Sequence, residues 1–225
     1  MVPEPLALTP RTFGWADANC YWTQRREHAR VGQQPIHRFL ASLVKEFAPP
    51  GGNVLDCGAG QGHVLRLCQP RCRVYACDIS TSVLEGYDFP LCGVRCADLN
   101  RGFPDFGVSF HVIVASWLLH WLDDPQRFLT EASRQLARGG RVIVNIPNIT
   151  HVRYRAQLLC GKFPRISPSH KNFQTPTEIE EMIQHTPLAI ERRLSPRRGL
   201  HRRLWPKLFS RDIVYVLAPR LRFAA

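Results

Sequence analysis

A glycine-rich segment, DCGAGQG at residues 56–62, follows a short apolar run and precedes an amphipathic one. Glycines let the backbone turn tightly and approach a ligand, and free amides at the start of the following helix can donate hydrogen bonds to it. The order of strand, glycine loop and helix is typical of α/β proteins that bind a ligand at the loop. The spacing departs from the dinucleotide pattern G-x-G-x-x-G, because Gly62 comes one residue early and position 63 is His63. A pyrophosphate ligand is therefore disfavoured.

Most of the chain repeats this alternation of apolar strands and helices. Strands are expected at 53–57, 73–77, 92–96, 110–116 and 141–146, and helices at 61–68, 81–86 and 125–137. Apolar strands separated by helices predict a parallel sheet covered on both faces. Two late strands, 188–194 and 212–217, predict an antiparallel hairpin added at the edge. The expected fold class is α/β, with a mainly parallel seven-stranded sheet closed by an antiparallel hairpin.

We expect two regions in one folded unit. Residues 1–50 form an N-terminal helical cap, since 16–47 carries apolar residues at helical spacing. Residues 51–225 form the α/β domain. An insertion at about 150–175 contains a basic helix and a loop, and lies on the substrate side of the domain.

Positive charge is concentrated in the last third of the chain. Residues 1–150 hold 15 Lys and Arg against 13 Asp and Glu, and residues 151–225 hold 15 against 5, so +10 of the net +12 follows residue 150. A basic surface attracts phosphates, nucleic acid, anionic lipid or an acidic partner, or only keeps an exposed face soluble. No apolar run approaches the roughly 18–20 residues of a membrane span, and 1–9 lacks the features of a secretory signal. A cytoplasmic location is expected.

Eight cysteines raise the question of a metal site. Their closest spacings, Cys68-x3-Cys72 and Cys92-x3-Cys96, do not give paired C-x-x-C motifs, and no His-x3-His follows. Most lie in apolar runs, where cysteine behaves as a small hydrophobic residue. We expect no metal.

Two aspartates stand at strand ends. Asp78 comes 20 residues after Gly58, and an acid at this position can accept two hydrogen bonds from the vicinal hydroxyls of a ribose. Asp98 follows the third strand, where a carboxylate could meet an adenine amino group. The alternative for either residue is a capping role in a turn.

These residues, with VLDCGAGQG at 54–62, ADL at 97–99 and SWLLH at 116–120, resemble the class I S-adenosylmethionine-dependent methyltransferases over residues 20–217. The resemblance implies a single Rossmann-like methyltransferase domain and S-adenosyl-L-methionine as cofactor. It implies a set of cofactor-binding residues that runs from the N-terminal helix to the fourth strand: Tyr21, Asp56, Gly58, Gly60, Gly62, Asp78, Ile79, Asp98, Leu99, Ser116 and Trp117.

The resemblance also assigns a place to each of these residues. Asp56 and the three glycines would lie under the methionine moiety, and Asp78 would hold the ribose. Asp98 and Leu99 would flank the adenine. Ser116 and Trp117 would line the end where the methyl group is transferred, and Tyr21 would close over the cofactor.

A second group of motifs resembles a narrower branch, the MetW-like proteins and small-molecule methyltransferases. It comprises VNIPN at 144–148, H-x-R-x-R at 151–155 and the loop SHKNFQT at 169–175. Many members carry Glu-His after the fourth strand, whereas this chain has Leu119-His120. A neutral histidine can accept the proton of an acceptor group, so the candidate catalytic residues are His120 and His170.

The sequence thus predicts methyl transfer to an O or N atom of a small-molecule metabolite. Arg153, Arg155 and Arg165 would recognise an anionic one. The alternatives are a non-catalytic, MetW-like regulatory partner and an RNA methyltransferase. Nucleic acid is disfavoured, because no Asn-Pro-Pro-aromatic motif follows the fourth strand and few aromatic residues interrupt the basic stretch 192–203. The expected assembly is a homodimer.

Overall fold

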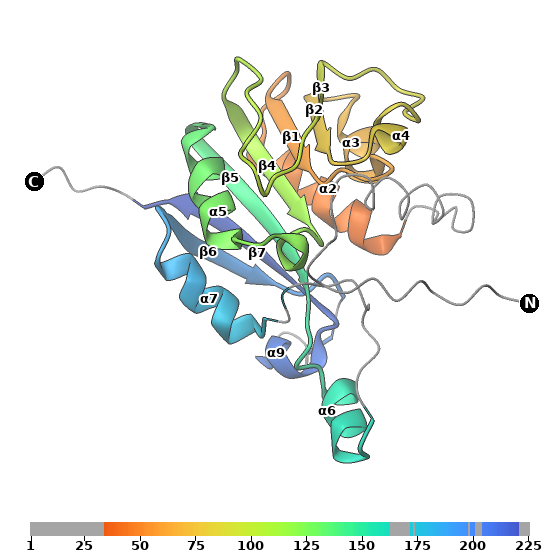
Figure 1. The fold of residues 1–225 in the computed structure, drawn as a ribbon, viewed down its shortest axis with the longest axis vertical. Coiled ribbons are helices and arrows are strands. Elements are labelled where there is room, and N and C mark those ends of the chain that lie inside the picture. Colours follow the sequence, from red (N-terminus) through yellow and green to blue (C-terminus); the bar gives the residue numbers. More distant parts are fainter. Residues whose placement is uncertain (1–33, 163–171, 173, 198, 201–203, 221–225) are drawn as a thin grey trace, which may run out of the picture.

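One seven-stranded sheet organises the molecule, in the strand order β3-β2-β1-β4-β5-β7-β6 (Figure 1). The computed structural model describes residues 34–162, 172, 174–197, 199–200 and 204–220. The strands are β1 (Asn53–Cys57), β2 (Arg73–Asp78), β3 (Gly93–Cys96), β4 (Phe110–Ser116), β5 (Leu136–Pro147), β6 (Leu188–Leu194) and β7 (Asp212–Pro219). The helices are α2 (Pro35–Phe47), α3 (His63–Cys68), α4 (Thr81–Leu84), the 3-10 helix η1 (Leu119–Trp121), α5 (Pro125–Arg134), α6 (Val152–Leu159), α7 (Pro176–Gln184) and α9 (Pro206–Phe209).

The first five strands are parallel, as the sequence predicts. β1 lies between β2 and β4, with Val54 opposite both Val74 and Val112. Because the strands run in one direction, their carboxyl ends meet at one edge of the sheet. That edge carries the residues at which β1, β2, β4 and β5 end, and open α/β sheets bind ligands there.

The last two strands close the sheet. β7 pairs antiparallel with both β5 and β6, which confirms the predicted hairpin. Since β6 and β5 are both antiparallel to β7, they run in the same direction, and β7 is the one reversed strand of the described sheet.

The structure corrects the boundary between the helix predicted at 125–137 and the strand that follows it. The sequence predicts a helix to residue 137 and a strand from 141, whereas α5 ends at Arg134 and β5 begins at Leu136. The register shifts between the pairs Phe110–Leu136 and Val112–Arg141, where the strand passes through two glycines. Gly139 has φ +77°, and a Cβ on Gly140 would lie 2.8 Å from the Phe110 carbonyl oxygen. An irregularity that depends on close approach to a neighbouring strand leaves no periodic signal.

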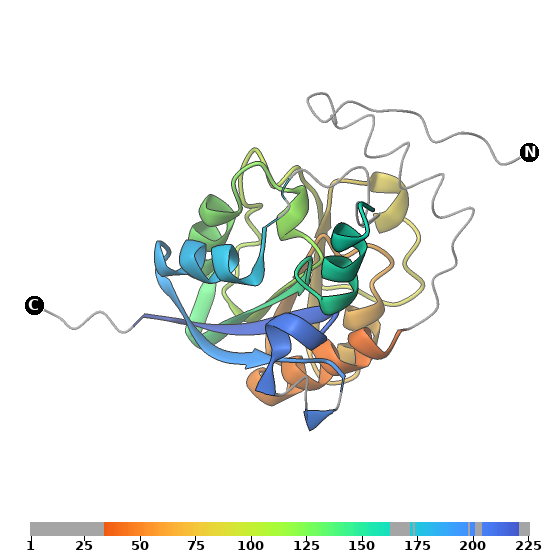
Figure 2. The same ribbon diagram turned by 90° about the horizontal axis from the view of Figure 1, so that it is seen from below.

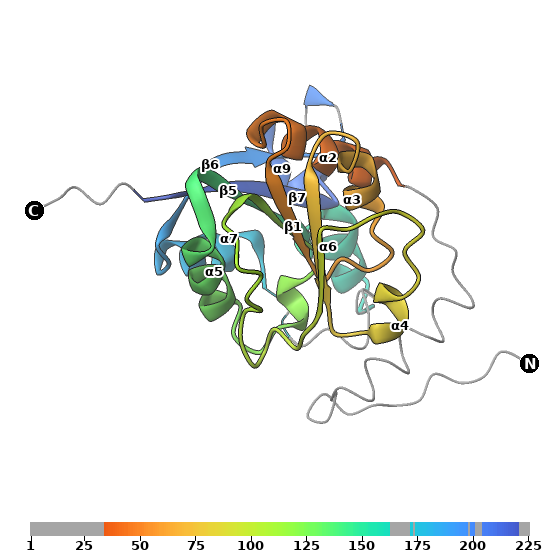
Figure 3. The same cartoon turned by 90° about the horizontal axis from the view of Figure 1, so that it is seen from above.

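Two apolar cores cover the two faces of the sheet. Successive side chains of a strand point to opposite faces, so Val54 packs in the core under α2 and α3, and Leu55 packs in the core under α5 and α7. Figures 2 and 3 show the sheet between these two helical layers. Of the helix predicted over 16–47, the structure describes α2 from Pro35 onward, which packs on one face of the sheet; residues 16–33 lie outside the described residues, and the N-terminal cap stays a prediction.

Candidate cofactor and substrate site

The glycine loop turns from β1 into α3 with positive backbone dihedrals. Gly58, Gly60 and Gly62 have φ of +66°, +52° and +68°, a region that non-glycine residues rarely adopt. A Cβ on Gly62 would lie 2.9 Å from both Tyr87 and Phe89, whereas a Cβ on Gly60 would meet nothing within 4 Å. Gly60 therefore faces open space, and Gly62 faces packed aromatic rings.

Asp78 joins this loop to the end of β2. Its side chain is 7% exposed, Oδ2 accepts a hydrogen bond from the Gly60 amide and Oδ1 accepts one from the Ser80 amide, both at 3.0 Å. Burial raises the pKa of Asp78, and the amides of Ser80, Gly60 and Ile79 partly offset that rise. A carboxylate has about four acceptor positions. The acceptor positions that these amides leave unused suit the hydroxyls of a ribose.

Asp56 is the most deeply buried acid at this edge. It is 3% exposed, and Oδ1 has no hydrogen-bond partner among the described residues. Burial and the neighbouring Asp78 raise the pKa of Asp56 to about 8. A buried acceptor without a donor costs free energy unless a ligand supplies one. The amino group of a methionine moiety is such a donor, so the site fits S-adenosylmethionine.

The raised pKa of Asp56 predicts a pH-dependent stability. Between about pH 4 and pH 8 the folded protein keeps a proton on the Asp56 carboxyl, whereas the unfolded chain releases it. The free energy of unfolding therefore falls as the pH rises toward 8, by up to about 1.4 kcal/mol per pH unit. His37, whose pKa is lowered to about 4 by burial and by His63, acts with the opposite sign up to about pH 6.5. Urea unfolding between pH 6.5 and 8 thus excludes the contribution of His37 and reports on Asp56 together with its neighbour Asp78, whose pKa is also raised.

In this window Asp56→Asn is expected to remove most of the slope, while Asp105→Asn, in an exposed turn, leaves it intact. An unchanged slope in Asp56→Asn would contradict the assignment.

The segment that follows β3 is tied to the end of β2. The amide of Ala97 donates to the Asp78 carbonyl at 2.9 Å, which brings the two strand ends together. Asp98 accepts from the Asn100 amide at 3.0 Å and therefore caps its own turn, while part of its carboxylate is exposed. Leu99 is buried in the core under α5 and α7. Ile79, next to Asp78, is half-buried.

Trp117 occupies a strained position directly after β4. It has φ +52°, the one positive value at a non-glycine residue in the described ranges, and its side chain is 44% exposed. Its indole N–H donates to Asp212 Oδ1 at 3.1 Å. Ser116, just before it, accepts from Asn145 Nδ2 at 3.3 Å. Strained residues cluster at ligand sites, so this geometry supports the predicted place of Trp117.

A small, open cleft lies beside the ends of β4 and β5. Apolar side chains form most of its wall, with three polar residues among them; its lining is Leu119, His120, Ile146, Pro147, Ile149, Asn172, Gln174 and Ile179. His120 is 8% exposed, and its carbonyl accepts from the Asn172 amide at 3.1 Å. Gln174 Oε1 is buried with no hydrogen-bond partner among the described residues. A few polar groups in an apolar cleft are typical of a small-molecule site.

The structure brings most of the predicted site residues to one edge. Tyr21 and His170 lie outside the described residues. Sequence reasoning missed Tyr87, whose hydroxyl donates to the Gly60 carbonyl at 2.7 Å. It included Asn145, Asn172 and Gln174 in the motifs at 144–148 and 169–175 but did not single them out as site residues. The residue types at these positions are common in cores and loops, and only long-range contacts reveal their place.

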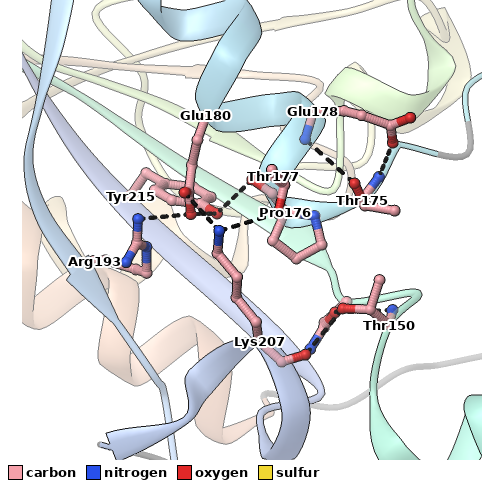
Figure 4. Close-up of polar contacts among 10 residues, drawn as sticks. Thr150, Thr175, Pro176, Thr177, Glu178, Glu180, Arg193, Lys207 and Tyr215 are labelled. Atoms are coloured by element: carbon pink, nitrogen blue, oxygen red, sulfur yellow. Dashed lines mark hydrogen bonds and ion pairs between the residues drawn. The ribbon is translucent and has the colours of Figure 1, made fainter.

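A network of ion pairs fixes α7, the helix that carries one wall of the cleft (Figure 4). Glu180 of α7 binds Arg193 of β6 and Lys207 of α9, each at 2.8 Å, and accepts from the Tyr215 hydroxyl at 3.0 Å. Lys207 also donates to Thr177 at 3.1 Å. Four elements are thus joined through one carboxylate, and Ile179 beside it faces the cleft.

Glu180→Ala is expected to lower the free energy of unfolding by about 2–3 kcal/mol, because it leaves two partly buried cations and a hydroxyl without their acceptor. Urea unfolding at pH 7.5 measures the change. Glu181→Ala removes a carboxylate from the next residue of α7, which is exposed, and should lower the free energy of unfolding far less. Equal losses in the two variants would show that the network contributes nothing particular.

Two glycines have similar backbone geometry, and comparing their alanine variants distinguishes the cost of backbone strain from the loss of a ligand contact. Gly60 and Gly107 have φ of +52° and +67°, and a Cβ on either meets nothing within 4 Å. Alanine is expected to cost roughly 1 kcal/mol of stability at both positions. Only Gly60→Ala should weaken the binding of S-adenosylhomocysteine, by about tenfold, since its methyl group enters the ligand's space. Calorimetric binding curves of the two variants decide this, and an equal affinity would remove Gly60 from the site.

The fold and the geometry of this edge define a class I S-adenosylmethionine-dependent methyltransferase. The chain belongs to the methyltransferase-domain family, whose model matches residues 21–192. S-adenosylmethionine is the cofactor of the class. In the part of the chain that the structure describes, no group of three or more His, Cys, Asp or Glu could hold a metal ion.

The named relatives are distant in sequence. A probable S-adenosylmethionine-dependent methyltransferase of Mycolicibacterium smegmatis is 27% identical over 196 residues, which cover 84% of this chain and 68% of that protein. A malonyl-[acyl-carrier protein] O-methyltransferase of Hahella chejuensis is 29% identical over 117 residues, 49% of this chain. The match spans 41% of the length of the Hahella protein.

Solved structures share the fold at low identity. An S-adenosylmethionine-dependent methyltransferase from Clostridium acetobutylicum has a TM-score of 0.62 at 16% identity, over 89% of this chain and 99% of that one. The CcbJ methyltransferase from Streptomyces caelestis has a TM-score of 0.65 at 18% identity, over 85% and 98%. These likenesses establish the seven-stranded α/β architecture.

Proposed function

We propose that this protein transfers the methyl group of S-adenosylmethionine to an O or N atom of a small metabolite bound in the cleft beside His120. The observation that carries the proposal is the position of the cleft. It opens between the residues that follow β4 and the end of β5, at the edge of the sheet where the glycine loop and Asp78 also lie. Donor and acceptor sites would therefore adjoin.

The chain's own residues have separate tasks in this reaction. When bound, the cofactor would supply a methyl group activated by its sulfonium, with S-adenosylhomocysteine as the leaving group when an acceptor atom attacks the methyl carbon in line. The glycine loop, Asp56 and Asp78 hold the donor, and the cleft orients the acceptor, which is the main source of rate in such a displacement. His120, in the wall of the cleft, accepts the proton that the acceptor releases.

The named relatives support both acceptor atoms. The Hahella relative is named for O-methylation of a malonyl group, and a Cereibacter sphaeroides relative, 29% identical over 125 residues, is named a phosphatidylethanolamine N-methyltransferase. Arg153 and Arg155, expected to bind an anionic acceptor, are exposed on α6 and do not line the described part of the cleft. Beside His120, Gln174 offers a buried oxygen without a hydrogen-bond partner among the described residues, which suits a hydroxyl or an amine, whereas the side-chain amide of Asn172 donates to the Leu122 carbonyl.

A cytoplasmic location and a homodimer stay predictions. No helix in the described ranges combines the length and the apolar character that a membrane crossing requires.

The experiment has two steps. Calorimetry first measures binding of S-adenosylhomocysteine, which we expect. Labelled S-adenosylmethionine is then incubated with panels of small carboxylic acids, phenols and amines, and with total RNA. Transfer to a small molecule supports the proposal. Binding without any transfer would favour the non-catalytic, MetW-like alternative, and labelled RNA would favour the RNA methyltransferase.

A further inference from the structure

Two segments of this chain carry positive charge with no acidic residue among them. Residues 148–177 hold five Lys and Arg, residues 192–211 hold eight, and neither segment contains Asp or Glu. Part of this charge is structural, because Arg192 pairs with Glu46 and both Arg193 and Lys207 pair with Glu180. Arg153, Arg155 and the other basic residues described there remain on the surface.

The same two segments expose most of the large apolar side chains found on the described surface. Eight large hydrophobic residues are exposed, and six of these belong to the two acid-free segments: Val152, Leu158, Leu159, Leu200, Leu204 and Trp205. Leu159 is 89% exposed. Scattered apolar residues are ordinary on a surface, but a concentration of them marks an interaction site.

The two segments meet at one end of the molecule. Thr150 Oγ1 and Asn148 Nδ2 both donate to the Lys207 carbonyl at 2.9 Å, so the base of α6 is tied to α9. Figure 1 shows α6 projecting beyond α9 at one end of the long axis, and α6 has no buried residue. We call α6, α9 and the described residues Gly199, Leu200, Leu204 and Trp205 that precede α9 the basic apolar end.

We propose that the basic apolar end docks on an anionic phospholipid surface. Leucine and tryptophan side chains partition into the boundary between headgroups and acyl chains, and lysine and arginine beside them are attracted by anionic headgroups. The shape favours lipid, because α6 presents Leu158 and Leu159 on a protrusion, and a soft surface accepts a protruding side chain without a matching groove. The complete absence of acidic residues from both segments gives the charge complementarity.

Docking would also bring the cleft close to the lipid. Ile149 lines the cleft, and α6 begins three residues later. An acceptor that partitions into membranes would suit this position. This choice of acceptor rests on the proposed function, whereas docking rests on the surface alone.

Vesicle cosedimentation of the full chain tests the proposal. We expect at least tenfold stronger binding to phosphatidylcholine vesicles that contain about one third phosphatidylglycerol than to phosphatidylcholine alone. Raising the salt from about 50 to about 500 mM should weaken binding severalfold, because it shortens the range of the attraction. No binding to the anionic vesicles, or equal binding to both kinds, would overturn the proposal.

Matched variants assign the effect to the surface. Leu158→Glu/Leu159→Glu and Arg153→Glu/Arg155→Glu should each reduce vesicle binding at least tenfold. Arg134→Glu/Arg138→Glu makes the same charge change near the start of β5, at the opposite end of that strand, and should reduce binding less than twofold. Unchanged binding of S-adenosylhomocysteine shows that each variant is folded, and it separates this result from failure of the proposed function.

A second copy of the chain is the competing occupant. Light scattering of the wild type and of Leu158→Glu/Leu159→Glu decides between the two. A stable dimer that the double variant dissociates, with no vesicle binding by the wild type, would overturn lipid docking, whereas unchanged oligomeric state with lost vesicle binding supports it.

Discussion

Asp78→Ala is expected to weaken the binding of S-adenosylhomocysteine by about a hundredfold, the largest loss of affinity that we predict. Two hydrogen bonds from ribose hydroxyls to a buried carboxylate are together worth roughly 3 kcal/mol. The substitution also leaves the amides of Gly60 and Ser80, each 3.0 Å from the carboxylate, without their acceptor. The ligand thus loses both its direct contacts and the geometry of the loop beneath it.

Asp105→Ala is the matched control. Asp105 also accepts a hydrogen bond from the amide two residues further on, at 2.8 Å from Gly107, but it lies in an exposed turn. Calorimetry should give an unchanged affinity for Asp105→Ala and an intermediate loss for Asp78→Asn, which keeps one acceptor oxygen. If Asp78→Ala binds as tightly as wild type, the ribose is held elsewhere.

The parts of the site that the sequence predicted share a physical cause. A short apolar strand can be recognised from its composition, and its carboxyl end then gives the place of Asp56, Asp78 and Ser116 at one edge of a parallel sheet. The glycine loop is equally local, since its positive φ values require glycine. These features are set within about ten residues of chain.

Other features depend on contacts between distant residues. Trp117 is held by Asp212, 95 positions later, and Glu180 gathers partners from three other elements (Figure 4). For Asp98 the sequence allowed two roles, a turn cap or a contact with adenine. The structure shows that Asp98 caps its turn by accepting a hydrogen bond from the Asn100 amide. No periodicity encodes such pairings, which arise only when the chain is folded.

The positive charge of the last third of the chain is partly predictable from the sequence and partly not. Its excess is plain in the sequence, but the sequence does not distinguish arginines that bind substrate from those on a surface. The structure places Arg153 and Arg155 on a helix without buried residues, next to exposed leucines. The charge is therefore better explained by an external partner than by the described cleft.

His120→Gln is expected to lower kcat for methyl transfer about a hundredfold, while the affinity for S-adenosylhomocysteine changes less than twofold. Loss of a positioned proton acceptor typically reduces a rate by about 10²–10⁴. His120 follows the end of β4 by four residues and lines the cleft, so its effect should fall on the transfer step and leave donor binding intact. Single-turnover rates with labelled cofactor measure it, once the panel has identified an acceptor.

Controls must separate proton transfer from packing, because His120 is 8% exposed and its loss could disturb the wall of the cleft. His185→Gln changes an exposed histidine at the end of α7 and should leave kcat unchanged. Imidazole added to His120→Gly should restore part of the rate, since a small base can enter the space that the side chain leaves. A purely structural His120 predicts no rescue. A wild-type rate in His120→Gln would mean that the acceptor loses its proton to water, and that in-line orientation alone supplies the catalysis.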